Sequence, residues 1–215
     1  ELTFLAHMIG AGSYVAHHPM RYYSTSDANS DAVTAAALAL GSNVNRVEGR
    51  GDGQQLEIAG NGDRWHADGC RAFLVGLGIY GQRASHKRIP APVFKLELEQ
   101  LAQFLKHLWA TEGSISEDQA AFSSASRGLV DDVSLLLLRF DIASSIQHKS
   151  TDTAAFDRYE LTVLGAACQR LFVEHIGGLD HEPMPAEMPQ DGDLDRVPTG
   201  DLIWDAIASI EPVGK

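Results

Sequence analysis

The feature that most constrains the fold is a weak internal repeat with a period of about 100 residues. Residues 25–33 lie 100 positions before residues 125–133, so that Asp31 corresponds to Asp131 and a valine follows each two positions later. Each copy opens with a Ser-rich segment and continues into apolar residues at helical spacing, a pattern typical of a capped helix. The repeat predicts two copies of one supersecondary unit.

A second correspondence lies upstream of each copy. Residues 5–13 resemble residues 105–114, and both are short apolar segments that lead to a small residue, then to position 11 or 112, and then to a glycine. We interpret both segments as helices that end at this glycine, because glycine accepts the positive φ of a helix cap at little cost.

The expected order is helix, two strands, helix, two strands, helix, and then the same again. Helices are predicted by apolar spacing and cap residues over 3–10, 28–40, 64–77, 98–111, 127–140 and 166–176. Strands are predicted over 13–16, 20–25, 45–50, 54–59, 114–116, 119–125, 143–149 and 157–163. Residues 178–200 are rich in Pro, Gly and Asp, which indicates a loop or linker.

Net charge argues against tight binding to nucleic acid when it is taken over the whole chain. The formal charge is −12, of which −7 falls on residues 178–215 and −5 on residues 1–177. A mildly acidic body is unusual for a protein that binds a polyanion. The sequence therefore predicts weak or salt-sensitive DNA affinity at most.

Other sequence features narrow the protein class. Cys70 and Cys168 are too few for a disulfide framework and lack zinc-ligand spacing, so we expect two buried thiols in a reducing cytoplasm. No apolar run approaches the length of a membrane span, and the first residues show no signal-peptide pattern. We expect a cytoplasmic monomer.

Five motifs carry a resemblance to a known family. They are residues 5–13, residues 21–26, residues 77–83, the Lys-x-Ile-Pro element at 87–90, and residues 104–113. Together with the repeat, they make the chain similar to the LAGLIDADG homing endonucleases, and most of all to the endonuclease domains of inteins in replicative DNA helicases. The resemblance covers roughly residues 2–177.

The resemblance implies an α/β (α+β) fold of two pseudo-twofold-related αββαββα repeats with saddle-shaped antiparallel sheets. The expected divisions are a first repeat (1–96), a second repeat (97–177), an acidic linker (178–200) and the start of the C-terminal segment of the intein splicing (Hint) domain (201–215). The chain neither begins with a splicing Cys or Ser nor ends with His-Asn, so we expect no splicing by this fragment alone.

The resemblance also implies a catalytic centre at the ends of the two motif helices. An acid at each end would hold Mg²⁺ in a two-metal site, and small residues would let the helices approach closely. Glu112 stands at the second acid position, whereas Ala11 stands where the family has Asp. Gly10 and Thr111 precede these positions and are the other candidate metal ligands. Lys87 of the Lys-x-Ile-Pro element would polarise the scissile phosphate or the attacking water, with an exposed loop lysine as the alternative.

The saddle would lie along the major groove of double-stranded DNA and read base edges. Basic residues on or near the expected strands are the candidate DNA contacts: Arg21, Arg46, Arg50, Arg139, Lys149 and Arg158. We interpret His7 and His107 as packing residues between the motif helices rather than as ligands. Strand alternation does not decide which basic residues face the groove.

Three functions follow from these residues. The chain is a site-specific endonuclease that cuts the intein-less host gene, a DNA-binding module without cleavage, or an inert insertion between the halves of a splicing domain. Because alanine cannot bind a metal ion, Ala11 predicts that double-strand cleavage is lost, with nicking of one strand as the most that survives.

Overall fold

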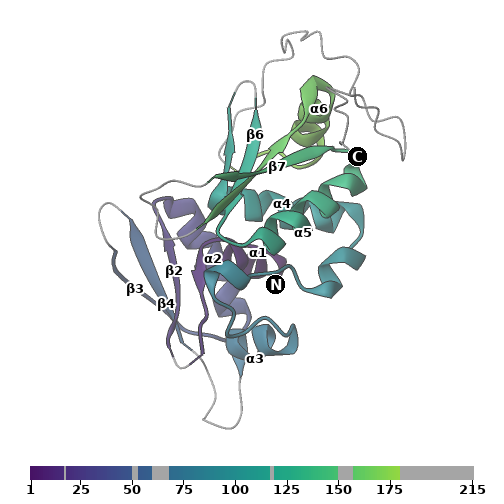
Figure 1. Ribbon diagram of the computed structural model, residues 1–215. Helices are drawn as coiled ribbons and strands as arrows, with labels where there is room; N and C mark the ends of the chain where they lie inside the picture. The colour runs from purple at the N-terminus through teal and green to yellow at the C-terminus, as the bar shows by residue number, and fades with distance from the viewer. Residues whose placement is uncertain (17, 50–52, 60–67, 117–118, 150–156, 180–215) are drawn as a thin grey trace, which may run out of the picture.

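The computed structural model describes residues 1–16, 18–49, 53–59, 68–116, 119–149 and 157–179. Its helices and strands follow the order expected from the repeat, so the mixed α/β fold with two antiparallel sheets is confirmed. Figure 1 shows the first half in purple and blue and the second half in teal and green. The segments expected to be a linker and part of a splicing domain lie outside the described residues, apart from 178 and 179.

The first half contains three α-helices and a four-stranded sheet. Its elements are α1 (Leu2–Ala11), β1 (Gly12–Ser13), β2 (Met20–Ser24), α2 (Asp27–Ala39), β3 (Val44–Glu48), β4 (Gln54–Ile58) and α3 (Gly69–Gly76). Two short 3-10 helices, η1 (Ala84–His86) and η2 (Ala91–Lys95), lie between the halves. The sequence predicted neither of them, because three to five residues are too few to show a helical period.

The second half repeats the arrangement. Its elements are α4 (Leu98–Glu112), β5 (Gly113–Ile115), β6 (Ala120–Ser124), α5 (Arg127–Leu137), η3 (Leu138–Phe140), β7 (Ser144–Lys149), β8 (Arg158–Val163) and α6 (Gly165–His175). The predicted helix over 127–140 is thus an α-helix that tightens into a 3-10 turn at its end.

Both sheets have the same antiparallel topology. The strand orders are β1-β2-β4-β3 and β5-β6-β8-β7. The register repeats as well, since Gly12 pairs with Tyr22 in the first sheet and Gly113 pairs with Phe122 in the second. The two halves are therefore equivalent in strand pairing as well as in element order.

The same serine turn starts the second helix of each half. Ser26 and Ser126 are the N-caps of α2 and α5, and each hydroxyl accepts from the backbone N–H three residues later. The hydroxyls of Ser24 and Ser124 accept in turn from the backbone N–H groups of these caps, both at 3.1 Å. Side-chain oxygens satisfy N–H groups that a helix end leaves without partners, which is why the Ser-rich segments fix these helix starts.

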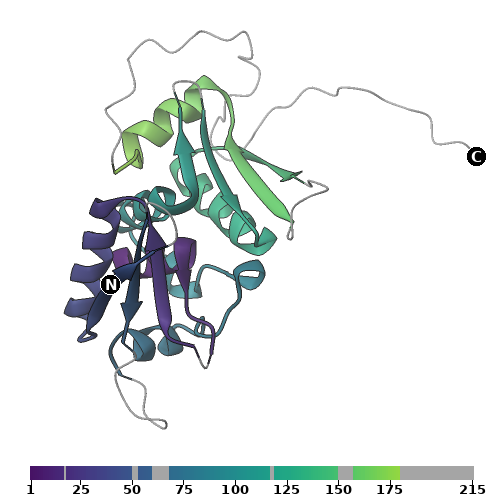
Figure 2. The same cartoon turned by 90° about the vertical axis from the view of Figure 1, so that its left-hand side faces the viewer.

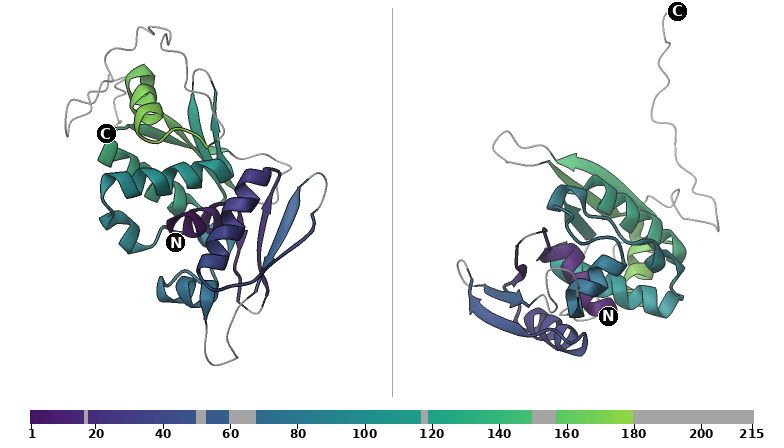
Figure 3. Two further views of the ribbon diagram at one scale, coloured as in Figure 1. Left: turned by 180° about the vertical axis from the view of Figure 1, so that it is seen from behind. Right: turned by 90° about the horizontal axis from the view of Figure 1, so that it is seen from below.

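One face of each sheet is buried under helices. In β2 and β4, buried Met20, Tyr22, Leu56 and Ile58 alternate with more exposed residues, and α2 packs on this sheet. In the second half, α5 packs on β6, β7 and β8. Figure 2 shows the second half above the first half. Figure 3 shows α1 and α4 packed against each other between the two halves. Among the described residues, no helix is long and apolar enough to cross a membrane.

Glycine is required after α1 and α4, but not because of the positive φ that the sequence led us to expect. Gly12 has φ −81° and Gly113 has φ −89°, so neither uses the left-handed region. Instead, a Cβ on Gly12 would lie 2.6 Å from the Cα of Met8. The chain turns so tightly from each helix into its strand that only glycine fits against the preceding helical turn.

Candidate functional site at the helix junction

The ends of α1 and α4 meet closely at the centre of the molecule. Gly10 lies against Thr111, where a Cβ added to Gly10 would come 2.6 Å from the Cβ of Thr111. Ala6 is fully buried on α1. The small residues therefore permit the close helix approach that was expected of this pair.

Ala11 and Glu112 are the last residues of their helices and occupy equivalent places. The N–H groups of Gly12 and Gly113 donate back to the carbonyls of Met8 and Trp109, which closes both helices in the same way. Each helix then leads directly into the first strand of its sheet. One helix end thus presents a carboxylate and the other presents a methyl group.

The Glu112 carboxylate is partly buried between cations. Burial raises its pKa, while the positive charges of Arg158 and Lys87 lower it. The Arg158 guanidinium is 3.9 Å from the Glu112 carboxylate, and both side chains are partly exposed. Such a pair is worth at most about 1 kcal/mol, so Glu112 remains available to another ligand.

Lys87 lies at the end of α1, as the Lys-x-Ile-Pro element led us to expect, but it is buried rather than exposed. Its ammonium donates to three backbone carbonyls, those of Met8 at 3.3 Å, Gly10 at 3.0 Å and Gly12 at 2.7 Å. The side chain is 6% exposed. Because the C-terminal end of a helix carries partial negative charge, a cation in this place stabilises it.

Burial also changes the acidity of Lys87. Desolvation lowers the pKa of the ammonium to about 8, and the nearby Glu112 charge opposes that shift. The ammonium is also 5.4 Å from the ring centroid of Tyr14, within the range of a cation–π contact. Lys87 is therefore a protonated helix cap near neutral pH.

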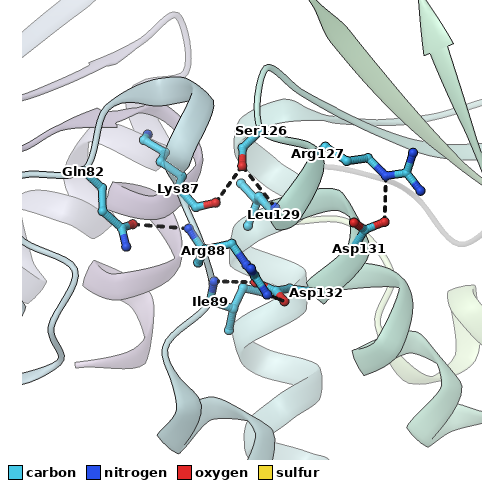
Figure 4. Close-up of polar contacts among 9 residues, drawn as sticks. All are labelled: Gln82, Lys87, Arg88, Ile89, Ser126, Arg127, Leu129, Asp131 and Asp132. Atoms are coloured by element: carbon cyan, nitrogen blue, oxygen red, sulfur yellow. Dashed lines mark hydrogen bonds and ion pairs between the residues drawn. The ribbon is translucent and has the colours of Figure 1, made fainter.

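The backbone around Lys87 is fixed by the second half of the molecule (Figure 4). The Lys87 carbonyl accepts from the Ser126 hydroxyl at 2.7 Å. The Asp132 carboxylate accepts from Arg88 Nε at 2.7 Å and Nη2 at 2.6 Å, and also from the Ile89 N–H at 2.9 Å. Residues 87–89 are thus held to α5 while the Lys87 side chain holds the end of α1.

The end of α4 is held in a comparable way by the first half. Asn29, near the start of α2, donates from its side-chain amide to the Ala110 carbonyl at 3.0 Å. The Thr111 hydroxyl donates to the Leu108 carbonyl at 2.6 Å. The end of α4 is therefore held by a neutral donor of the first half, and the end of α1 by a cation whose backbone the second half holds in place.

A histidine pair lies deeper between α1 and α4. His7 Nε2 is 3.2 Å from His107 Nδ1, His7 Nδ1 is 2.9 Å from the Tyr22 hydroxyl, and His107 Nε2 is 3.2 Å from the Thr3 hydroxyl. Burial and the neighbouring His107 lower the pKa of His7 to about 4. Their interpretation as interface packing residues is confirmed.

Three of the candidate DNA contacts lie on the open face of a sheet. Arg21 alternates with buried Met20 and Tyr22 along β2. Lys149 and Arg158 are paired neighbours on β7 and β8, three positions from the pair formed by partly buried Ile146 and buried Leu161, and therefore on the opposite face. Acids on the same face pair with two of these cations, Glu57 with Arg21 and Glu160 with Lys149.

The other three candidates are placed differently. Arg46 donates to Asp31 of α2 and therefore lies on the helix side of its sheet. Arg139 donates to the carbonyls of Phe94 and Leu96, which fixes the segment between the halves. Arg50 lies outside the described residues.

Sequence reasoning missed Asn29 and Asp132, which hold this junction together. Asn29 stood within a polar cap segment and looked like part of the helix start. Asp132 had a usable signal, because it interrupts the apolar face of α5 beside Val133, and a buried acid needs a specific partner. The partner itself, 44 residues away in the chain, left no local trace.

The donor set at the junction does not fit a two-metal centre. No group of three or more His, Cys, Asp or Glu side chains that could hold a metal ion occurs in the part of the chain that the structure describes. Glu112 is the carboxylate at the helix ends, and the Gly10 carbonyl already accepts from Lys87. Divalent ions such as Mg²⁺ are bound mainly by carboxylates, waters and substrate phosphates.

Residues 99–177 match the family model described as LAGLIDADG-like domain. The match covers α4 through α6, and these elements repeat the topology of the first half. Among solved structures, the fold of this chain is similar to that of the homing endonuclease I-DmoI. One I-DmoI structure aligns with a TM-score of 0.58 and 13% sequence identity, covering 86% of this chain and 95% of that one.

Curated relatives include two replicative DNA helicases named DnaB. The protein from Synechocystis sp. is 29% identical over 85% of this chain and 22% of the relative. The protein from Rhodothermus marinus is 32% identical over 83% of this chain and 20% of the relative. The chain thus spans about a fifth of the length of the helicases that it matches.

Proposed function

We propose that this chain is a DNA-binding domain of homing-endonuclease lineage that no longer makes double-strand breaks. The observation that carries the proposal is the pair of equivalent helix ends, of which one presents Glu112 and the other Ala11. Hydrolysis of both DNA strands needs an acid for each reacting phosphate, and a methyl group cannot bind a metal or accept a proton. The site therefore supports nicking of one strand at most.

The open sheet faces supply the proposed DNA contacts. Arg21 on one sheet and Lys149 and Arg158 on the other would contact phosphates or base edges. All three cations already lie near acids, so DNA must compete with Glu57, Glu160 and Glu112. I-DmoI, with which this chain shares its fold, has been solved in complex with DNA. We expect weak binding that decreases steeply with salt, because phosphate contacts release counterions.

We propose that this chain binds a divalent metal ion at one of the two helix ends only. I-DmoI has been solved with DNA in the presence of Mn and of Ca. In this chain Glu112 would hold a divalent ion at the end of α4, and a DNA phosphate would have to complete the ligand set. The ion would supply Lewis-acid chemistry at one strand. The protein's own part is to present the Glu112 carboxylate, with Arg158 beside it, toward that position.

The biological context of the proposal is an intein. The matched regions of the replicative helicases are about a fifth of those proteins, as expected of an insertion within a longer chain. We propose that the domain lies in an intein of a replicative DNA helicase, that residues 201–215 resume its splicing domain, and that the DNA target is the uninterrupted host gene. We further propose that the domain is a cytoplasmic monomer.

The experiment compares the chain with its Ala11→Asp variant. A plasmid that carries the uninterrupted helicase gene is incubated with each protein and Mg²⁺, and nicked and linear products are separated on a gel. We expect linear product from Ala11→Asp alone. Ala91→Asp, at an exposed alanine of η2, is the matched control for added negative charge and should give none.

Two results would reject the proposal. Efficient linearisation by the unmodified chain would show that Ala11 does not prevent double-strand cleavage. If neither protein cuts and neither shows salt-dependent binding to the plasmid fragment, the chain acts as an inert insertion. The paired charges on the open sheet faces favour an inert insertion over tight DNA binding.

A further inference from the structure

We propose that the Lys87 ammonium is the resident cation of the α1 half of the junction, and that this half consequently has no divalent-metal site. The inference rests on the proposed function, in that it treats the junction as the remnant of a metal-dependent nuclease centre. It goes further because it assigns Lys87 the electrostatic role that a metal ion would otherwise have at Ala11.

The contacts of Lys87 support this role directly. Its ammonium donates to the carbonyls of Gly10 and Gly12, on either side of Ala11, and to that of Met8. These three bonds use all three donors of an ammonium group. Three carbonyl oxygens at the end of α1 are thus already bound by a cation, and residue 11 contributes no carboxylate that would attract a second one.

The surrounding charges are already balanced without a metal. The Glu112 carboxylate lies near two cations, Lys87 and Arg158, which both favour its charged form. A divalent ion at the α1 end would face the Lys87 ammonium at close range. Like charges repel strongly where burial excludes water, so the ion would have to displace Lys87.

Lys87 cannot be displaced without undoing other contacts. Its carbonyl accepts from Ser126, and the next two residues are bound by the buried Asp132 carboxylate (Figure 4). The side chain itself is 6% exposed. An exposed lysine on a flexible loop would move aside for a metal ion, whereas this one is fixed from both its backbone and its ammonium.

The test measures binding of Mn²⁺ alone to the DNA-free chain by electron paramagnetic resonance of the free ion. Four proteins are compared: the unmodified chain, Ala11→Asp, Ala11→Asp with Lys87→Met, and Ala11→Asp with Lys95→Met. Lys95 is an exposed lysine of the same inter-half segment and serves as the matched control. Circular dichroism melts establish that each variant is folded.

We expect the DNA-free chain to bind no more than one Mn²⁺, and DNA-free Ala11→Asp to bind little better, because Lys87 pairs with the new carboxylate and no DNA phosphate is present to complete the ligand set. Removal of Lys87 in the Ala11→Asp background should then tighten Mn²⁺ binding by about tenfold or more, whereas removal of Lys95 should not. If the Lys87→Met protein does not fold, Lys87→Gln keeps a donor for the α1 carbonyls without the charge and should give the same gain.

Two results would overturn the inference. One is stoichiometric binding of two Mn²⁺ ions by the unmodified chain, and the other is equal affinity with and without Lys87. Its failure is distinguishable from that of the proposed function. Equal affinities together with plasmid cutting by Ala11→Asp reject the role of Lys87 alone, whereas a Lys87-dependent gain without any DNA binding or cutting rejects the DNA function alone.

Discussion

The buried histidine pair makes the stability of this protein depend on pH in a direction that the structure fixes. His7 is fully buried, and its pKa falls from 6.5 to about 4 because burial and His107 both disfavour the charged imidazolium. Desolvation also lowers the pKa of His107. Below the unfolded pKa of 6.5, the unfolded chain therefore binds protons that the folded chain refuses.

The sign and the size follow from linkage. The lowered pKa of His7 has no effect on stability above pH 6.5. It decreases the free energy of unfolding as the pH falls from 6.5 toward 4. A shift of about 2.5 pKa units corresponds to a loss of about 3 kcal/mol, at no more than about 1.4 kcal/mol per pH unit. Full protonation of the pair would also place two N–H groups against each other across the 3.2 Å between His7 and His107.

The assay is urea unfolding, followed by circular dichroism, at a series of pH values between 7.5 and 4.5. The chain is compared with His7→Gln, which keeps an amide for hydrogen bonding but does not titrate, and with His86→Gln, an exposed control. Carboxylate effects are common to all three proteins and cancel in the differences. We expect the His7→Gln protein to lose less stability as the pH falls. An identical pH dependence of the chain and His7→Gln would refute the reasoning.

Three further predictions concern stability and are checked by the same unfolding measurements. Gly10→Ala should destabilise the protein by about 2 kcal/mol or more, because the new methyl group overlaps Thr111 at the helix crossing. Asp132→Ala should cost about 2 kcal/mol, mainly through the N–H group of Ile89 that loses its acceptor, since the Arg88 partner is exposed and can be hydrated. The turns after α2 and η3 form a matched pair with positive φ, 81° at Gly41 and 58° at Asp141. Gly41→Ala should cost about 1 kcal/mol although its Cβ meets no atom within 4 Å, and Asp141→Gly should be neutral or stabilising. A stabilising effect of Gly41→Ala, or a destabilising effect of Asp141→Gly, would contradict the backbone argument.

The sequence predicted the fold well because the information for it is local. The Ser-rich caps and the alternating apolar positions act within a few residues, and their recurrence 100 positions later identified the second copy. The predicted helix and strand positions agree with the structure over most described elements. The exceptions are short elements and element ends: η1 and η2 were not predicted, α3 begins at Gly69 rather than at residue 64, and β1 ends at Ser13 instead of continuing to residue 16.

The site was less predictable because its contacts are long-range. The motif spacing placed Ala11 and Glu112 at equivalent helix ends. It could not show that Lys87 points back onto α1, 75 to 79 residues earlier in the chain, or that Asp132 holds it there. The direction of Arg46 was equally hidden, since it depends on the register of β3 against β4.

The contacts between the halves at the ends of α1 and α4 have a consequence for recombination between relatives. Asn29 of the first half holds α4, while Ser126 and Asp132 of the second half hold the segment that caps α1. Neither half therefore carries all the groups that finish its own central helix. A chimera that combines one half of this chain with the other half of a relative inherits two unmatched sets of donors and acceptors. Successful recombination across this boundary requires that both sets are transferred together, so the two copies of the duplication can no longer change independently.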